Sequence, residues 1–244
     1  MAVLLRAKNR SYLSGTALLF TCLGIASYAS ANLLLDPSFE PGIAGAPDAS
    51  SGDVPMSVSG PWSGWNNWVP PYSAYYTQSI PAEDGVQLGK TFSGPNGGIY
   101  QYVAANAGDS YTASAYFVNS SSDPMQDGET DDVRMIFWSG PNGTGSSLAT
   151  DVSAGVVSDL SPADTWIQLS VTASAPVGTE SIQWMAFFNN PNYDGGSLFV
   201  DNGSLVDNSA PVPEPTTALL AMVAGIPLVM RRAARKGTDR SSGR

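Results

Sequence analysis

The fold class is decided by one stretch of seven residues, Ile182-Gln183-Trp184-Met185-Ala186-Phe187-Phe188. Its first, third, fifth and seventh positions are apolar, and residues two apart in a strand share one face of the sheet. The intervening positions are also large, with Met185 and Phe187 among them. We therefore predict a central strand that turns one face to the core and the other to a groove.

Alternation of the same kind recurs along the chain. The further stretches are Ile99–Val103, Tyr111–Phe117, Val133–Trp138 and Ile167–Ala173. Turn-forming clusters rich in Gly, Pro, Asn and Asp separate them, at 93–98, 107–109, 140–143 and 190–192. No long stripe with a period of 3.6 residues is present. The pattern predicts an all-β protein, an antiparallel β-sandwich or jelly roll.

Charge is divided sharply along the 244 residues. Residues 32–210 hold 19 of the 21 acidic residues but only two of the 11 basic ones, Lys90 and Arg134, which gives a formal charge of −17. Nucleic acid requires clustered Lys and Arg, so this balance excludes it as a partner, and an anionic membrane surface likewise. Binding of divalent cations, a place among neutral sugars, or simple solubility remain open.

Histidine and cysteine, two residue types that are common in catalysis, are not available in the exported domain. The chain has no histidine, and its one cysteine, Cys22, lies in the N-terminal apolar stretch. Ser-His-Asp and Cys-His catalysis, disulfides and cysteine metal sites are therefore excluded for the remainder. Only carboxylate chemistry stays possible.

Residues 1–31 have the pattern of a secretory signal peptide. Arg6, Lys8 and Arg10 precede a mostly apolar stretch, Leu13 to Ala26, and small residues at 29–31 suit cleavage. We expect the chain to enter the secretion translocon and residues 32–207 to form one exported domain.

Residues 208–244 combine the three parts of a sorting signal. The motif Val212-Pro213-Glu214-Pro215 is held extended, because proline restricts its own φ and the residue before it. The apolar run Thr216–Met230 has 15 residues, interrupted by Pro227, whereas a spanning helix needs about 20. A basic stop follows, made of Arg231, Arg232, Arg235 and Lys236. This favours a short hydrophobic helix that inserts into the membrane transiently.

The stretch from Val212 to Lys236 resembles the PEP-CTERM sorting domain of Gram-negative, biofilm-forming bacteria. The resemblance implies recognition and processing near the motif by an exosortase, a membrane-embedded cysteine transpeptidase. It also implies export across the inner membrane and a final place at the cell surface or in the extracellular matrix. The tail at 237–244 is longer than the family pattern.

The domain between the signals has a second resemblance. It opens with Asn-Leu-Leu-Leu-Asp-Pro-Ser-Phe-Glu at 32–40 and closes with Leu-Phe-Val-Asp-Asn-Gly-Ser-Leu at 198–205, with short motifs at 101–103, 108–115 and 166–170 between them. This order resembles the galactose-binding-like jelly roll of carbohydrate-binding modules of the CBM4/9 group. The resemblance implies neighbouring first and last strands with a structural calcium between them, held by Glu40 and Asp201. Two ordinary strand-end acids are the alternative.

The acidic segment Asp123–Asp132 has two interpretations. It shares acids at positions 1, 5 and 9 and a glycine at position 6 with an EF-hand loop. However, Met125 stands at position 3 and Arg134 at position 12, where the loop requires a bidentate Glu. These departures favour a solvated, mobile loop.

The aromatic cluster Trp62, Trp65 and Trp68 is the candidate ligand site. Three Trp within seven residues, in a Pro/Gly/Asn context, exceed what a short loop can bury. Flat aromatic faces stack on pyranose rings, and neighbouring Asn side chains can bond the hydroxyls. We expect at least one of these Trp in the core and another in contact with ligand, while Trp138 and Trp184 belong to the core or a groove floor.

Three classes of function follow. The leading one is a non-enzymatic surface or matrix protein that binds extracellular polysaccharide or structures exopolysaccharide and biofilm. The second is a small glycan-active hydrolase or lyase, for which Glu83, Asp84 and Glu129 are the candidate acids, although the sequence does not give the separation that a carboxylate pair needs. The third is a purely structural coat protein.

Overall fold

The computed structural model describes residues 31–66, 73–92, 94–192 and 194–209. Their strands are β1 Val54–Pro55, β2 Ser63–Asn66, β3 Ser73–Tyr76, β4 Leu88–Phe92, β5 Asn96–Ala104, β6 Ser110–Val118, β7 Thr130–Trp138, β8 Ser147–Val152, β9 Val157–Ser158, β10 Ile167–Ser174, β11 Ser181–Asn189 and β12 Ser197–Asp207. Two short 3-10 turns, η1 Ile43–Gly45 and η2 Pro141–Gly143, complete the elements. The five stretches that alternate in sequence lie within β5, β6, β7, β10 and β11, so those strand predictions are confirmed.

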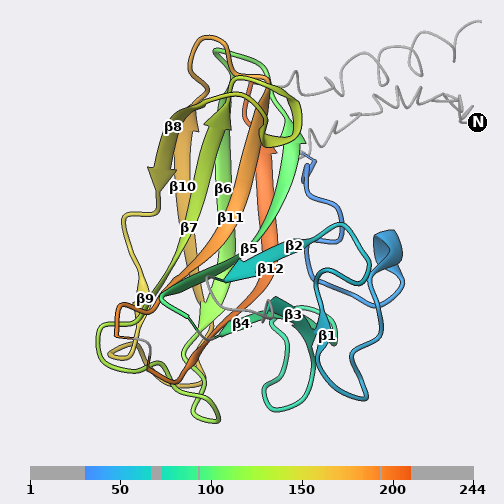
Figure 1. Ribbon diagram of the computed structural model, residues 1–244, viewed down its shortest axis with the longest axis vertical. Coiled ribbons are helices and arrows are strands. Elements are labelled where there is room, and N and C mark those ends of the chain that lie inside the picture. The colour runs from blue at the N-terminus through green and yellow to red at the C-terminus, as the bar shows by residue number, and fades with distance from the viewer. Residues whose placement is uncertain (1–30, 67–72, 93, 193, 210–244) are drawn as a thin grey trace, which may run out of the picture.

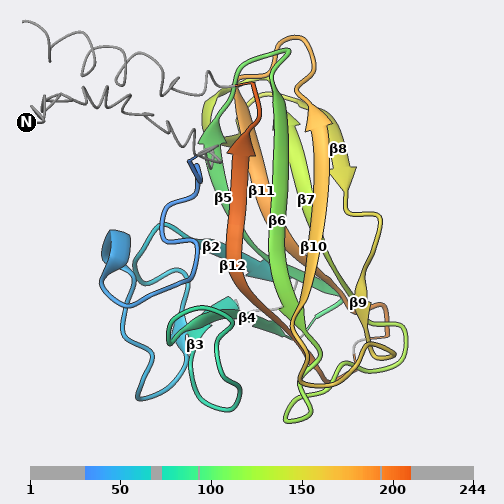
Figure 2. The same ribbon diagram turned by 180° about the vertical axis from the view of Figure 1, so that it is seen from behind.

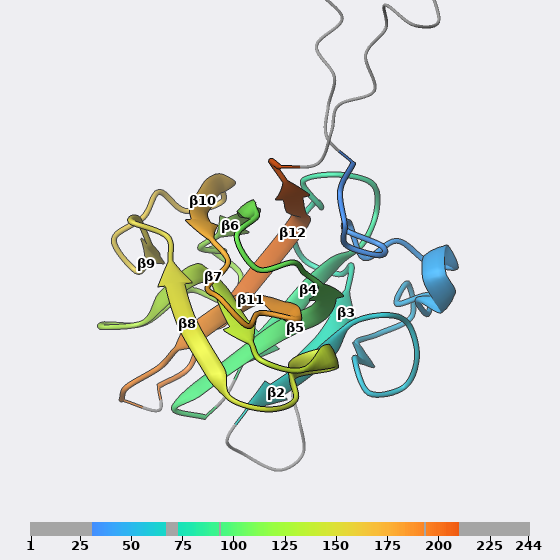
Figure 3. The same ribbon diagram turned by 90° about the horizontal axis from the view of Figure 1, so that it is seen from above.

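The strands form two antiparallel sheets packed face to face. Sheet A has the order β1-β3-β4-β12-β6-β10, and sheet B has the order β2-β5-β11-β7-β8 with β9 beside β7. Figure 1 looks onto sheet B, Figure 2 onto sheet A from behind, and Figure 3 shows the two layers from above. The chain is thus an antiparallel β-sandwich of the jelly-roll type, as predicted.

Strand β11 lies in the middle of sheet B, between β5 and β7. Met185 is opposite Tyr100 on one side and Arg134 on the other. Ile182, Trp184, Ala186 and Phe188 belong to the core, and none of them is exposed. The intervening side chains therefore point out of the sandwich, which confirms the prediction of a central strand with two large faces.

An aromatic group fills the core between the sheets. The ring of Trp62 stacks on Phe39 at 4.7 Å between centroids and meets Trp184 edge to face at 5.2 Å. The indole N–H of Trp62 donates to the carbonyl of Asp36 at 2.7 Å, so its one polar atom is satisfied. This group fixes the segment after β1 against sheet B.

The two ends of the domain lie side by side, as the framing motifs predict. Leu33 N–H donates to the carbonyl of Leu205 at 2.8 Å, and Gly203 N–H to that of Pro37, also at 2.8 Å. The opening segment is not a regular strand, however. Asp36 and Phe39 have φ of 50° and 59°, and this left-handed backbone interrupts the extended conformation of a strand.

Both targeting signals, residues 1–31 and 208–244, lie outside the described part of the chain except for residues 31, 208 and 209. Within that part, no helix has the length and apolar character to cross a bilayer.

Candidate functional site

The outer face of sheet B carries a row of aromatic side chains, which we call the platform: Trp65, Tyr100, Tyr102 and Phe187. The three strands that supply them, β2, β5 and β11, are neighbours in the sheet. Each platform side chain is half-buried, so an edge or a face of each remains open to solvent.

The four rings touch one another in sequence across the strands. Trp65 lies 5.9 Å from Tyr100 and 6.0 Å from Phe187, measured between ring centroids. Tyr100 meets Tyr102 edge to face at 5.4 Å. Such contacts hold aromatic pairs in place beyond the area that they bury. The platform is therefore a continuous, pre-organised surface.

Two glycines leave room for the platform rings. The ring of Trp65 occupies the space next to Gly98 that any Cβ there would enter. At the other end, Tyr102 packs against Gly143 of η2, where a Cβ would also clash and where φ is +72°. The absence of a side chain at Gly98 and Gly143 therefore makes room for Trp65 and Tyr102, respectively.

Arg134, on β7, borders the platform without offering it a free charge. Its guanidinium lies 3.5 Å from the ring centroid of Phe187. The same group donates to both carboxylate oxygens of Asp132, with Nη2 at 2.7 Å from Oδ2. A cation on an aromatic face that is also neutralised by a carboxylate acts as a flat, polar extension of the platform.

The platform combines flat apolar faces with neutral hydroxyls. Burial, and to a smaller extent the neighbouring Tyr100, raises the pKa of Tyr102, so its hydroxyl stays protonated at neutral pH and can both donate and accept. Gln183, buried on the same face of β11, adds an amide. Aromatic planes bordered by hydroxyl and amide groups suit a ligand with apolar ring faces and hydroxylated edges.

The three predicted Trp residues have different fates. Trp65 belongs to the platform, as the ligand hypothesis requires. Trp62 is only 2% exposed and lies in the core, which leaves it no surface for a ligand and corrects its assignment as a binding residue. Trp68 falls outside the described residues. Of the other two, Trp184 is fully buried in the core and Trp138 is half-buried on β7.

Glu40 and Asp201 come together around one loop, residues 83–87. Asp201 Oδ2 accepts from the backbone N–H groups of Glu83 and Asp84, at 2.7 and 2.9 Å. Glu40 Oε1 accepts from Val86 and Gln87, at 2.7 and 3.0 Å. The two predicted acids therefore bind the same loop by hydrogen bonds, Glu40 from the first segment of the domain and Asp201 from the last.

The fit of this pair to calcium is partial. Asp201 also accepts an N–H of Asn202 at its other oxygen, so both of its oxygens have partners. Beside Glu40, the buried Oδ2 of Asp36 has no hydrogen-bond partner, and burial raises the pKa of Asp36 to about 6. Among the described residues, no three acidic, His or Cys side chains are grouped to hold a metal. Calcium stays a prediction.

The acidic segment Asp123–Asp132 is not simply solvated. Glu129 and Asp131 have no exposed surface, and three of their four carboxylate oxygens lack a partner. Glu129 Oε2 accepts from Gln126 N–H at 2.6 Å, which closes the turn. Burial raises the pKa of Glu129 to about 7 and that of Asp131 well above its usual value. The expectation of a solvated loop is therefore wrong at these two positions.

Of the candidate catalytic acids, Glu83 and Asp84 are neighbours and both have hydrogen-bond partners, whereas Glu129 belongs to another turn and keeps one buried oxygen without a partner. Glu83 Oε2 accepts from Asn202, and Asp84 Oδ2 accepts from Ser38, both in the loop held by Asp201. Glu129 is enclosed in its own turn. The platform lies on sheet B, and Asp132, the carboxylate beside it, is paired with Arg134.

Sequence reasoning placed Phe187 on the groove face of the central strand but missed three platform-side residues, Tyr100, Tyr102 and Arg134. The signal was available in β11, whose two faces are both large, and that observation did predict a groove. Locating the aromatic partners required the register of β5 and β7 against β11, which the sequence does not state.

No protein-family model matches the chain, and no curated protein matches it in sequence. Several solved structures have a related shape at low identity. A CBM61 module in complex with β-1,4-galactotriose is 16% identical, with a TM-score of 0.48 over 73% of this chain and 100% of that one. A CBM22-1 xylan-binding domain from Paenibacillus barcinonensis is 15% identical, with a TM-score of 0.46 over 76% and 100%. A Stig cyclase from Fischerella sp. TAU is 13% identical, with a TM-score of 0.49 over 75% and 100%. Likenesses this distant show no function for this chain.

Proposed function

We propose that the domain is a non-enzymatic carbohydrate-binding module whose site is the platform on sheet B. The observation that carries the proposal is the continuous row of Trp65, Tyr100 and Tyr102, with Phe187 behind it. An open row of aromatic faces suits the repeated ring faces of a polysaccharide chain. A purely structural coat protein has no need to keep four rings at a solvent-facing surface.

The charges favour a neutral glycan. Residues 32–210 carry a formal charge of −17, and both of their basic residues are paired, Arg134 with Asp132 and Lys90 with Asp123. Polyanionic chains such as uronates would be repelled without a compensating cation. The expected ligands are therefore uncharged hexose or pentose polymers.

Substitution of single platform residues tests the proposal. Trp65→Ala and Tyr100→Ala should each weaken binding to a glycan-array hit by about ten-fold or more, since loss of a central aromatic contact typically exceeds 1 kcal/mol. Tyr116→Ala is the matched control, because Tyr116 is also half-buried but lies on the outer face of sheet A. Unchanged affinity in both platform variants, or equal loss in the control, would refute the platform as the site.

Turnover separates the module from a glycan-active hydrolase or lyase. The purified chain should leave the soluble glycan that it binds intact, as judged by reducing ends and by ultraviolet absorbance of unsaturated products. Release of either product, abolished by Glu129→Gln, would instead support the enzyme.

We also propose that the chain is exported and sorted through its C-terminal signal to the surface or matrix of a Gram-negative, biofilm-forming cell. The support is the order of Val212-Pro213-Glu214-Pro215, apolar run and basic stop in the sequence. Replacing Pro213-Glu214-Pro215 with three alanines should leave precursor in the inner membrane. Normal amounts of mature protein at the surface of that variant would rule out exosortase recognition of the motif.

A structural calcium between the first and last segments remains part of the proposal. Glu40 and Asp201 would hold it, and the unpartnered oxygen of Asp36 is the support for an oxygen-rich site there. Adding calcium to chelator-treated protein should raise the melting temperature, and Glu40→Gln should abolish that rise. An identical melting temperature with and without calcium would remove the ion from the proposal.

A further inference from the structure

A pocket lies on the opposite side of the sandwich from the platform. Its volume is ≈ 320 Å³, and it lies where β6 ends and β10 begins. Its apolar wall is formed by Ile80, Pro81, Val118 and Trp166, and its polar rim by Ser79, Ser121 and Asp164. We call it the Trp166 pocket.

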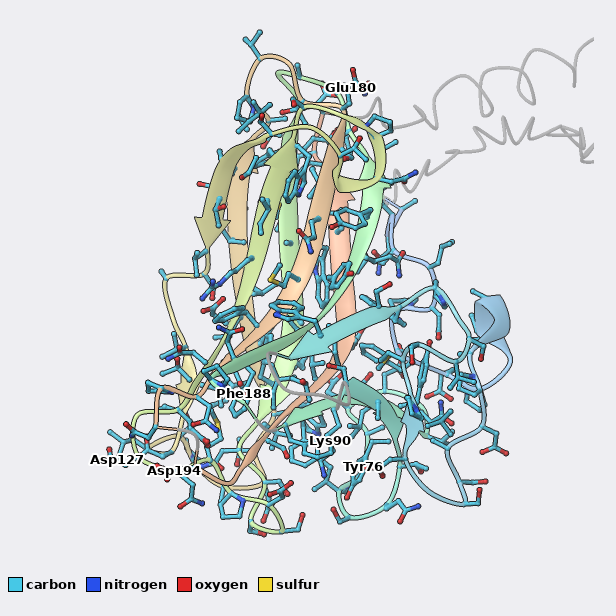
Figure 4. All side chains as sticks on the ribbon, in the orientation of Figure 1. Tyr76, Lys90, Asp127, Glu180, Phe188 and Asp194 are labelled. Carbon is cyan, nitrogen blue, oxygen red and sulfur yellow. The ribbon has the colours of Figure 1, made fainter. Side chains whose placement is uncertain are left out.

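The pocket lies on the outer face of sheet A. Val118 follows Phe117 of the core by one position in β6, so its side chain points out of the sandwich. It packs with Tyr76, Leu88 and Phe199 in a separate apolar cluster, against which Ile80 and Trp166 lie. Figure 4 labels Tyr76 in this region beside Lys90, whose ammonium is 4.7 Å from the Tyr76 ring centroid. The platform and the pocket therefore face in opposite directions.

The pocket walls are held in place before any ligand arrives. Trp166 donates its indole N–H to the carbonyl of Pro81 at 3.3 Å, which fixes the ring relative to the loop before β4. Ser121 donates to both carboxylate oxygens of Asp164, from its N–H at 2.8 Å and from its hydroxyl at 2.6 Å. Asp164 also has a φ of 54°, an uncommon conformation outside glycine that these bonds maintain.

The chemistry of the pocket matches one uncharged sugar ring. One indole supplies a flat apolar wall, and hydroxyl and carboxylate groups on the rim can bond ring hydroxyls. The hydrogen bonds from Ser121 lower the pKa of Asp164, so its carboxylate is ionised at neutral pH and would repel an acidic sugar. A volume of ≈ 320 Å³ is at the small end of ligand sites, which run from about 300 to 1,000 Å³, so it suits one ring rather than a chain.

We propose that the Trp166 pocket is a second carbohydrate site that takes a single neutral sugar residue, the end or a branch of a glycan. This inference rests on the proposed function, in which the platform binds a segment of another polysaccharide. With the two sites on opposite faces, one domain can connect two polysaccharide chains, and linked sites gain avidity without any new contact. This gives a matrix-structuring role a physical basis in one small domain.

The test uses the Trp65→Ala variant of the whole chain, which separates the pocket from the platform. The probes are the methyl glycosides of glucose, galactose, mannose and xylose, each a single neutral ring. At least one should shift the indole N–H resonance of Trp166, identified by its loss in Trp166→Phe, and leave the buried indole of Trp184 unmoved. Trp166→Ala should weaken that glycoside by about ten-fold or more, whereas Thr165→Ala, an exposed neighbour, should not.

The two proposals fail in different ways. If no glycoside shifts the Trp166 indole while Tyr100→Ala still weakens polysaccharide binding, the pocket is not a sugar site and the platform stands. If a glycoside shifts Trp166 but the platform variants bind glycan normally, the pocket alone survives. The resonance shift is measured in the Trp65→Ala protein, which retains Trp166. The test therefore still decides the question even if the Trp166→Ala variant folds poorly.

Discussion

The indole of Trp65 on β2 lies directly over Gly98 on β5, in space that a side chain at Gly98 would fill. The two residues are paired in register, and Trp65 reaches Tyr100 and Phe187 only because Gly98 leaves the sheet surface low at this point. Gly98 is thus the backbone feature that lets one ring join the others into a row.

Gly98→Ala should weaken glycan binding through Trp65. The new Cβ would displace the indole and also approach the carbonyl oxygen of Ala186, so a stability cost is expected as well. Measuring glycan affinity in a double-mutant cycle with Trp65→Ala isolates the first effect, since coupled residues are not additive. The affinity loss from Gly98→Ala should largely vanish in the Trp65→Ala background. Fully additive losses would mean that Trp65 does not act through this contact.

Trp62 should matter to stability and not to binding. It is 2% exposed, stacks on Phe39 and meets Trp184 edge to face. Trp62→Ala should lower the free energy of unfolding by about 3–5 kcal/mol because it empties a large core volume, and Trp62→Phe by less. Urea denaturation measures this cost, and glycan affinity measured below the transition should equal that of the parent. A selective loss of affinity in Trp62→Phe at near-parent stability would return Trp62 to the binding site.

Asp201 should act as the anchor of the loop 83–87. Its Oδ2 accepts two backbone N–H groups and its Oδ1 accepts a third, from Asn202. An asparagine has one acceptor oxygen and an NH2 group that only donates, so at least one of these N–H groups must lose its partner. Asp201→Asn should therefore cost about 1–3 kcal/mol and speed hydrogen exchange at the amides of Glu83 and Asp84. Glu83→Gln is the control, because it keeps both backbone bonds. Unchanged exchange at these two amides in Asp201→Asn would show that the loop is held by other contacts.

The fold was predictable because the hydrophobic period is local information. The alternation in Tyr111–Phe117 places Ala113 and Ala115 in the core by itself, and all four inward positions of that stretch are buried. The binding surface depends on register between strands far apart in sequence. Tyr100 and Met185 are 85 positions apart and meet only because β5 pairs with β11. The clustering of Trp residues in the sequence therefore assigned Trp62 to the ligand site, although the fold turns it inward, and did not identify Tyr102.

Buried carboxylates whose environment the sequence could not reveal set the pH dependence of stability. Figure 4 shows Asp127 and Asp194 at one end of the sandwich and Glu180 at the other. Glu129 belongs to the same acidic segment as Asp127, residues 123–132. Burial raises its pKa from 4.5 to about 7, with smaller contributions from the charges of Asp194 and Asp123. A carboxyl with a raised folded-state pKa binds its proton more tightly in the folded state than in the unfolded one. Its contribution to stability is therefore complete below about pH 4.5 and is lost as the pH rises to about 7.

Glu129→Gln should remove that loss. The amide keeps an oxygen to accept from Gln126 N–H and carries no charge to bury. Relative to the parent, the variant should gain stability between pH 4.5 and 7, by about 3 kcal/mol at the upper end, since each pKa unit corresponds to 1.36 kcal/mol. That corresponds to roughly 6–12 °C in melting temperature for a domain of this size. Asp127→Asn, an exposed change on the same turn, should show no such pH-dependent gain. A melting difference between Glu129→Gln and the parent that stays constant across this range would mean that Glu129 ionises normally in the folded protein.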